Sequence, residues 1–183
     1  VDIRGNVGTR LSRVAGLERF AADDTGVGRG THGDLDAVVL AAAGLARLGL
    51  SEVVTEFLDP RRVLPAAGQG CLAIEYRSGS TPAGVLAAIR ALQDGPTELA
   101  VQAERALLLR LEAGCAAPIG AFARLEEGTL TLDAVVADPR GGEVLRESAT
   151  APAAGPEESR ALGTRVAESL LERGADRYTD RTS

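Results

Sequence analysis

The feature that most constrains this chain is residues 103–120, a leucine-rich amphipathic stretch that runs into a single cysteine, Cys115. Apolar side chains recur there at spacings of three and four, which predicts a helix with one buried stripe. We expect Gly114 to end this helix in the left-handed conformation and Pro118 to prevent the helix from resuming. Cys115 would then lie on a turn just past a helix end, a common place for functional groups.

The local pattern leaves two interpretations of Cys115 open. Cysteine is among the most frequently buried residues, and it often packs as a small apolar side chain. A reactive thiol instead needs exposure and a positively charged environment. Neither is decided by residues 103–120 alone.

Three further stretches, taken together with residues 103–120, carry a family resemblance. They read RGNVGTRL at residues 4–11, DAVVLAAAGLARLGL at residues 36–50 and LPAAGQGCLAIE at residues 64–75. In this order the four stretches resemble the porphobilinogen deaminases, also called hydroxymethylbilane synthases, of tetrapyrrole biosynthesis. The resemblance covers most of the chain, from Arg4 to about Gly174.

The resemblance implies a three-domain α/β enzyme that joins four porphobilinogen molecules head to tail and releases ammonia at each step. It also implies a dipyrromethane cofactor that is linked to one cysteine through a thioether, and Cys115 matches that cysteine. Because each pyrrole carries an acetate and a propionate, the site must bind many carboxylates, and arginine binds a carboxylate through two parallel hydrogen bonds. The residues that match the binding positions are Arg4, Arg10, Arg47, Gln69, Gly70 and Arg105.

Less specific interpretations stay open beside this one. The turn at residues 5–8 precedes a helix start that could attract an anion, but glycines also form ordinary turns. Arg47 could be a solvated surface side chain. The chain could be a noncatalytic module that binds a polycarboxylate while Cys115 stays unmodified, or Cys115 could be core and the arginines could face solvent.

The expected organisation has three parts. Residues 1–58 would be a remnant of a periplasmic-binding-protein-like domain 2, with an inserted loop at residues 15–33. Residues 59–95 would return the chain to domain 1, and residues 96–183 would form the α+β domain to which the cofactor is attached. The predicted strands are residues 36–42, 55–58, 71–76, 119–125, 129–137 and 143–150, and the last three would form an antiparallel meander. Helices are predicted at residues 9–14, 43–48 and 81–92. Two further helices would begin at about residue 97 and after a linker at residues 151–156.

The chain departs from the family pattern in ways that limit the assignment. The portion that holds the catalytic aspartate of the family finds no match, so we assign no catalytic residue and expect this stretch alone to be inactive. Ala113 stands where the family usually has a second glycine. The nearby acids Asp94, Glu104 and Glu112 lie on or beside a helix that we expect to be exposed, so they are expected to be solvated.

Composition narrows the function classes. The 183 residues carry 20 basic and 26 acidic side chains, a formal net charge of −6, which argues against a nucleic-acid partner. No apolar run reaches the roughly 18 residues of a membrane span, and no leader is evident, so we expect a cytoplasmic protein that is monomeric at full length. With two cysteines that form no C-x-x-C pair and one histidine, His32, neither a disulfide framework, a zinc site nor a Cys-His pair is expected. The chain contains no Met, which favours a fragment.

Overall fold

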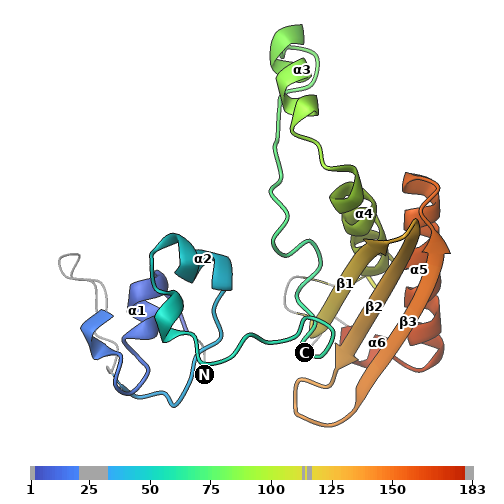
Figure 1. The fold of residues 1–183 in the computed structure, drawn as a ribbon. Helices are drawn as coiled ribbons and strands as arrows, with labels where there is room; N and C mark the ends of the chain where they lie inside the picture. Colours follow the sequence, from blue (N-terminus) through green and yellow to red (C-terminus); the bar gives the residue numbers. More distant parts are fainter. Residues whose placement is uncertain (1–2, 21–32, 113, 115–116, 180–183) are drawn as a thin grey trace. The chain divides into compact units, whose positions relative to one another are not determined.

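The structure is a computed structural model that describes residues 3–20, 33–112, 114 and 117–179. It divides into two compact units, Val1–Phe57 and Leu58–Ser183. Figure 1 shows the elements of both, and each unit is described by itself below.

The first unit is built from short helices. Its elements are α1 (Val7–Leu11), the 3-10 helix η1 (Glu18–Phe20), α2 (Ala42–Arg47) and the 3-10 helix η2 (Ser51–Val53). Asn6 caps α1, because its side-chain oxygen accepts a hydrogen bond from the Thr9 amide at 2.8 Å. Leu11 and Leu45 are the only buried apolar side chains among the described residues of this unit. Most of the predicted insertion, residues 21–32, lies outside the described residues.

Three predicted strands are wrong. Residues 36–42, 55–58 and 71–76 join no sheet, and the first of these stretches instead runs into α2 at Ala42. Their apolar side chains are not buried: Val39, Phe57 and Leu72 are 74%, 72% and 91% exposed. A strand forms only where a neighbouring strand accepts its backbone hydrogen bonds, and the described part of the chain supplies no such neighbour.

The second unit contains the sheet. Its elements are α3 (Ala83–Ala91), α4 (Gly95–Arg110), β1 (Ile119–Glu126), β2 (Thr129–Ala137), β3 (Val144–Pro152), α5 (Pro156–Glu172) and α6 (Asp176–Thr179). The three strands form an antiparallel sheet in the order β1-β2-β3, so the predicted meander is confirmed. Helices α4 and α5 lie side by side on one face of this sheet (Figure 1).

The core lies between that pair of helices and the sheet. Leu107 of α4, Leu132 of β2 and Leu170 of α5 are completely buried, as the leucine stripes of the sequence predict. The two helices approach closely at Gly163, where an added Cβ would lie 2.1 Å from the Ala103 carbonyl oxygen. Gly163 is therefore required by packing.

The end of α4 differs from the prediction. The helix ends at Arg110 with Leu111 as its C-cap, and Glu112 takes the left-handed conformation, with φ at 51°. Cys115 and Ala116 lie outside the described residues. The helix therefore stops earlier than the glycine position predicts, at a residue with a side chain.

Both edges of the sheet are covered. At the β1 edge the Ala121 amide donates to the Pro65 carbonyl at 2.8 Å. At the β3 edge two arginines donate to strand carbonyls: Arg165 of α5 to that of Thr150 at 2.9 Å, and Arg173, the C-cap of α5, to that of Arg146 at 2.6 Å.

Candidate functional site

The first group of predicted ligands surrounds the turn before α1. Gly5 has φ at 108°, and an added Cβ there would lie 2.8 Å from the Thr9 methyl group, so the turn requires glycine. Arg10 donates from Nε to the Gly5 carbonyl at 2.8 Å, which holds its side chain against the turn. Because α1 has only five residues, its dipole gives little attraction for an anion, and the guanidinium is the stronger binding group.

Arg4 and Arg47 are exposed in the same unit. Within the described part of the chain neither has an ion pair or a side-chain hydrogen bond, whereas Arg13 is held by Asp34, its Nε lying 2.9 Å from Oδ1. Their guanidinium groups are therefore available to a carboxylate from outside the protein. Arg62, Arg77 and Arg90 are equally available, so availability alone does not single out a site.

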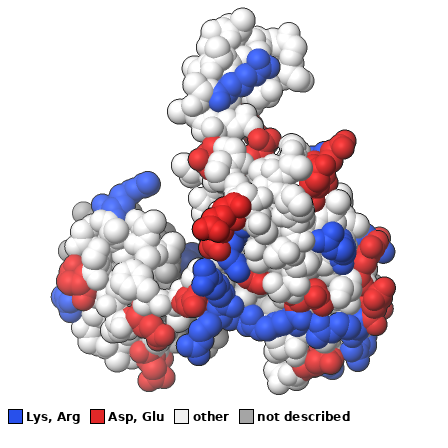
Figure 2. Space-filling view, turned by 45° about the vertical axis from the view of Figure 1, so that its right-hand side comes forward, with Lys and Arg blue, Asp and Glu red and all other residues white. Residues whose placement is uncertain are grey.

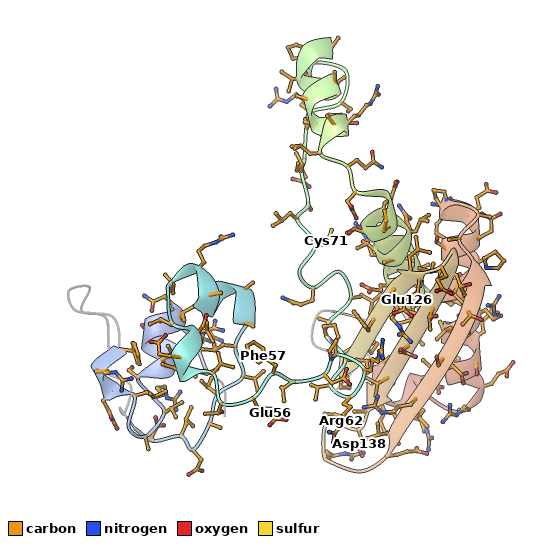
Figure 3. All side chains as sticks on the ribbon, viewed as in Figure 1. Glu56, Phe57, Arg62, Cys71, Glu126 and Asp138 are labelled. Carbon is orange, nitrogen blue, oxygen red and sulfur yellow. The ribbon has the colours of Figure 1, made fainter. Side chains whose placement is uncertain are left out.

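The second unit holds the other predicted ligands. Gln69 lies between Gly68 and Gly70, whose φ angles of 72° and 87° require glycine. The backbone N–H of Gln69 donates to the Ala66 carbonyl at 3.0 Å. Cys71 follows on the stretch that leads to α3, where Figure 3 labels it. Its thiol is free and exposed.

Glu104 of α4 has an environment that the sequence analysis did not predict. It was expected to be solvated, but it is only 6% exposed, so that prediction is wrong. Its carboxylate accepts the Gly68 amide at 2.6 Å and the Ala123 amide at 2.7 Å. Burial raises the pKa of Glu104 above its ordinary value, although these two hydrogen bonds act in the opposite direction.

A sequence signal for this burial exists. Glu104 lies three and seven residues before Leu107 and Leu111, two buried side chains, and therefore on the apolar stripe of α4.

Asp94 was also expected to be solvated. It is exposed, but it caps α4, because its side chain accepts the Thr97 amide at 2.9 Å, and this bond lowers its pKa.

Arg105 follows Glu104 on α4 and is exposed, with no ion pair or side-chain hydrogen bond among the described residues. Many other charges of the second unit lie beside charges of opposite sign (Figure 2), as in the pairs Arg61–Glu126 and Arg110–Glu168. Arg105 thus resembles Arg4 and Arg47 in being free to bind an external carboxylate. The predicted attachment residue, Cys115, lies outside the described residues.

The predicted ligands therefore form two groups, one on each unit. Arg4, Arg10 and Arg47 belong to the first unit, and Gln69, Gly70 and Arg105 belong to the second. In the described ranges no cluster of three or more His, Cys, Asp or Glu side chains could hold a metal ion. No described helix has the length and apolar character needed to span a membrane.

Comparison with known proteins divides the chain at a later point than the two units do, so that Gln69 and Gly70 fall in the same matched domain as Arg4, Arg10 and Arg47. A family model described as "Porphobilinogen deaminase, dipyromethane cofactor binding domain" matches residues 1–83, and one described as "Porphobilinogen deaminase, C-terminal domain" matches residues 98–172. This chain belongs to the porphobilinogen deaminase family. The family resemblance seen in the sequence is thereby confirmed, and the first model links residues 1–83 to a dipyrromethane cofactor.

Individual members of the family match almost the whole chain. Porphobilinogen deaminase of Cutibacterium acnes is 50% identical over 98% of this chain and 56% of its own length. The enzymes of Micrococcus luteus and Desulforudis audaxviator are 44% and 46% identical, over 96% of this chain in both cases and 57% and 50% of their own lengths. The chain thus spans about half the length of the curated relatives it matches.

The described residues fit a dipyrromethane cofactor. Such a group presents several carboxylates, and Arg4, Arg47 and Arg105 offer guanidinium groups that no described acid neutralises. Arg10 uses only Nε within the described residues, so its two terminal nitrogens are available. Arginines that already pair with acids, such as Arg13 and Arg110, would have to give up those partners first.

Proposed function

We propose that this chain is part of a hydroxymethylbilane synthase, which condenses four porphobilinogen molecules head to tail and releases ammonia at each step. The observation that carries the proposal is the match of both family models, joined to a set of exposed arginines at the matching positions that lack acidic partners. The dipyrromethane cofactor, when bound, supplies the pyrrole chain on which condensation begins.

The residues of this chain have binding tasks in the proposed reaction. Cys115 holds the cofactor through a thioether, since a thiolate is a strong nucleophile toward carbon. Arg4, Arg10, Arg47 and Arg105 bind the acetate and propionate groups, each through a planar, permanently charged fork. Gln69 and Gly70 add donors from a turn whose glycines allow close approach of the backbone.

The proton donor for the leaving amine is not assigned to any described acid. Glu104 already accepts two amide hydrogen bonds in a buried position, and Asp94 already caps a helix. A general acid must reach the leaving group, and neither carboxylate is free to do so. The proposed activity therefore belongs to the full-length enzyme.

The proposal extends to organisation and environment. Residues 1–58 would be part of a periplasmic-binding-protein-like domain, residues 59–95 would return the chain to another domain, and residues 96–183 would carry the cofactor. The full-length protein would be a cytoplasmic monomer that binds neither nucleic acid nor membrane. The net charge of −6 supports the exclusion of nucleic acid.

Intact-mass measurement on the full-length protein tests the attachment. We expect a covalent adduct of the mass of a dipyrromethane, located on Cys115 by peptide mapping and lost in Cys115→Ser. An unmodified thiol in active protein would overturn the assignment.

Substitution of the arginines tests carboxylate binding. Arg4→Leu and Arg10→Leu should block elongation while leaving the circular dichroism spectrum unchanged, because each removes a bidentate ligand. Arg90→Leu is the matched control, since Arg90 is also exposed and unpaired but is assigned no ligand. Full turnover in the Arg4 and Arg10 variants would contradict their assignment.

A further inference from the structure

The edge of β1 that faces away from β2 carries two backbone donors, and each has found an acceptor outside the sheet. Successive residues of an edge strand point their backbone groups alternately toward and away from the sheet, so the Ala121 and Ala123 amides face the same way. The Ala121 amide meets the Pro65 carbonyl at 2.8 Å. The Ala123 amide meets the Glu104 carboxylate at 2.7 Å instead.

Glu104 links this edge to the turn that carries Gln69 and Gly70. Its Oε1 accepts the Ala123 amide, and its Oε2 accepts the Gly68 amide at 2.6 Å. The N–H groups of Gly68 and Ala123 cannot hydrogen-bond to each other, because both are donors. A buried carboxylate with one oxygen for each donor joins two segments that would otherwise leave two N–H groups without acceptors.

Residues 62–70, which end in this turn, form a strap against the sheet. Arg146 of β3 donates to the Arg62 carbonyl at 2.7 Å. Leu64 lies over Gly120, where an added Cβ would be 2.8 Å from the Leu64 Cβ and 2.9 Å from a Val135 methyl group. The strap therefore contacts β1 and β3 before Glu104 fixes its last residues.

We propose that Glu104 is a positioning residue, which fixes the turn of Gln69 and Gly70 to the helix that carries Arg105 and leads toward Cys115. This inference rests on the proposed function, because it takes that turn and Arg105 to act on one polycarboxylate ligand. The strap, the turn and α4 then form one body, and a polycarboxylate bound by Arg105 lies at a constant distance from the turn.

The chemistry of position 104 favours this function over simple packing. The position lies on the apolar stripe of α4, where a leucine would complete the core without burying a charge. A buried carboxylate is costly unless hydrogen bonds compensate it. Here both compensating donors come from outside α4, one from the sheet edge and one from the ligand-binding turn.

Amide hydrogen exchange in the full-length protein without substrate tests the link directly. Glu104→Gln keeps the size of the side chain but turns one acceptor oxygen into an NH₂ donor, which cannot accept the second amide. We expect exchange at residues 66–71 and at Ala123 to rise about tenfold or more, as for the loss of a charge-assisted hydrogen bond. Glu112→Gln, an exposed acid just past the same helix, should leave these amides unchanged.

A second variant reaches the strap without touching the carboxylate. Leu64→Gly removes the Cβ that lies over Gly120, and exchange at residues 62–70 should again rise, with that at the core of β2 unchanged. Exchange at residues 66–71 that stays at the wild-type rate in Glu104→Gln would overturn the proposal. So would a uniform increase over β2 and α5, since that result marks general loss of stability.

Steady-state kinetics separates positioning from structure. Glu104→Gln should raise the KM for porphobilinogen several-fold at a temperature well below its melting temperature, where the protein is fully folded, and Glu112→Gln should not. Unchanged kinetic constants beside faster local exchange would overturn the positioning. A wild-type protein without turnover would overturn the proposed function, while hydrogen exchange would still decide whether Glu104 fixes the turn.

Discussion

The two units of this chain differ in what they bury. The second unit packs α4 and α5 on a three-stranded sheet around completely buried leucines, so it contains both layers that a small domain needs. The described residues of the first unit bury only Leu11 and Leu45 among apolar side chains, although residues 36–42 are strongly apolar. An apolar stretch thus forms a core only where other helices or strands are present to pack against it.

The largest expected effect tests this comparison by separating the units. Residues 58–183 alone should unfold in one cooperative transition, whereas residues 1–57 alone should show none, because two buried leucines cannot offset the entropy of ordering the chain. Thermal circular dichroism measures both. A cooperative transition in residues 1–57 would show that the contrast between the units is wrong.

The next effect lies at the closest contact of the second unit. Gly163→Ala should destabilise it by about 3 kcal/mol, because the added methyl group meets the fixed carbonyl of Ala103. Gly84→Ala in α3 is the matched control: nothing lies within 4 Å of its added Cβ, and alanine should stabilise that helix by up to about 1 kcal/mol. Urea unfolding measures both, and equal effects would argue against tight α4–α5 packing.

A smaller and pH-dependent effect lies on the sheet. Partial burial raises the pKa of Asp133, but hydrogen bonds from Ser148 and Arg124 and the charge of Arg124 outweigh it, so the pKa lies below its ordinary value. Asp133 therefore stabilises the fold above the ordinary pKa of about 3.9, and this stability is lost as the pH falls through the lowered value.

Asp133→Asn should accordingly cost about 1–2 kcal/mol at pH 7 and progressively less below about pH 4. Urea midpoints at pH 7 and pH 3 measure this difference. Glu75→Gln, at an exposed position with no side-chain hydrogen bond in the described chain, should give little difference at either pH. If the difference in urea midpoint between wild type and Asp133→Asn were larger at pH 3 than at pH 7, the stabilising role of the Asp133 carboxylate would be contradicted.

The smallest effect lies in the hairpin between β1 and β2. Glu127 and Gly128 both have positive φ, at 48° and 77°, which is the geometry of a type I′ turn. Asparagine tolerates this conformation better than glutamate, so Glu127→Asn should stabilise the second unit by a few tenths of a kcal/mol. A small rise in melting temperature would confirm it, and a fall would contradict it.

The sequence predicts the second unit well because its signals are local. Alternating apolar residues and short turns predict the meander at residues 119–150, and the leucine stripe predicts α5. The strands predicted at residues 36–42, 55–58 and 71–76 fail because strand formation depends on partners that a local pattern does not contain.

The candidate site is predicted unevenly for a similar reason. The arginines follow from the family motifs, and the structure leaves Arg4, Arg47 and Arg105 unpaired among its described residues. Glu104 was assigned to solvent because charged residues are usually exposed. Its place on the apolar stripe of α4 indicates burial, but the Gly68 and Ala123 amides that make the burial tolerable lie elsewhere in the chain, Gly68 36 positions away, so local sequence does not identify these partners.

Arg165 of α5 and Arg173, its C-cap, lie at the outer margin of β3, and they affect how the protein behaves at high concentration. An incoming polypeptide that tried to continue the ladder there would first have to displace the guanidinium groups that already occupy the Arg146 and Thr150 carbonyls. Fibril growth from this margin is thereby opposed by charge and by occupied acceptors.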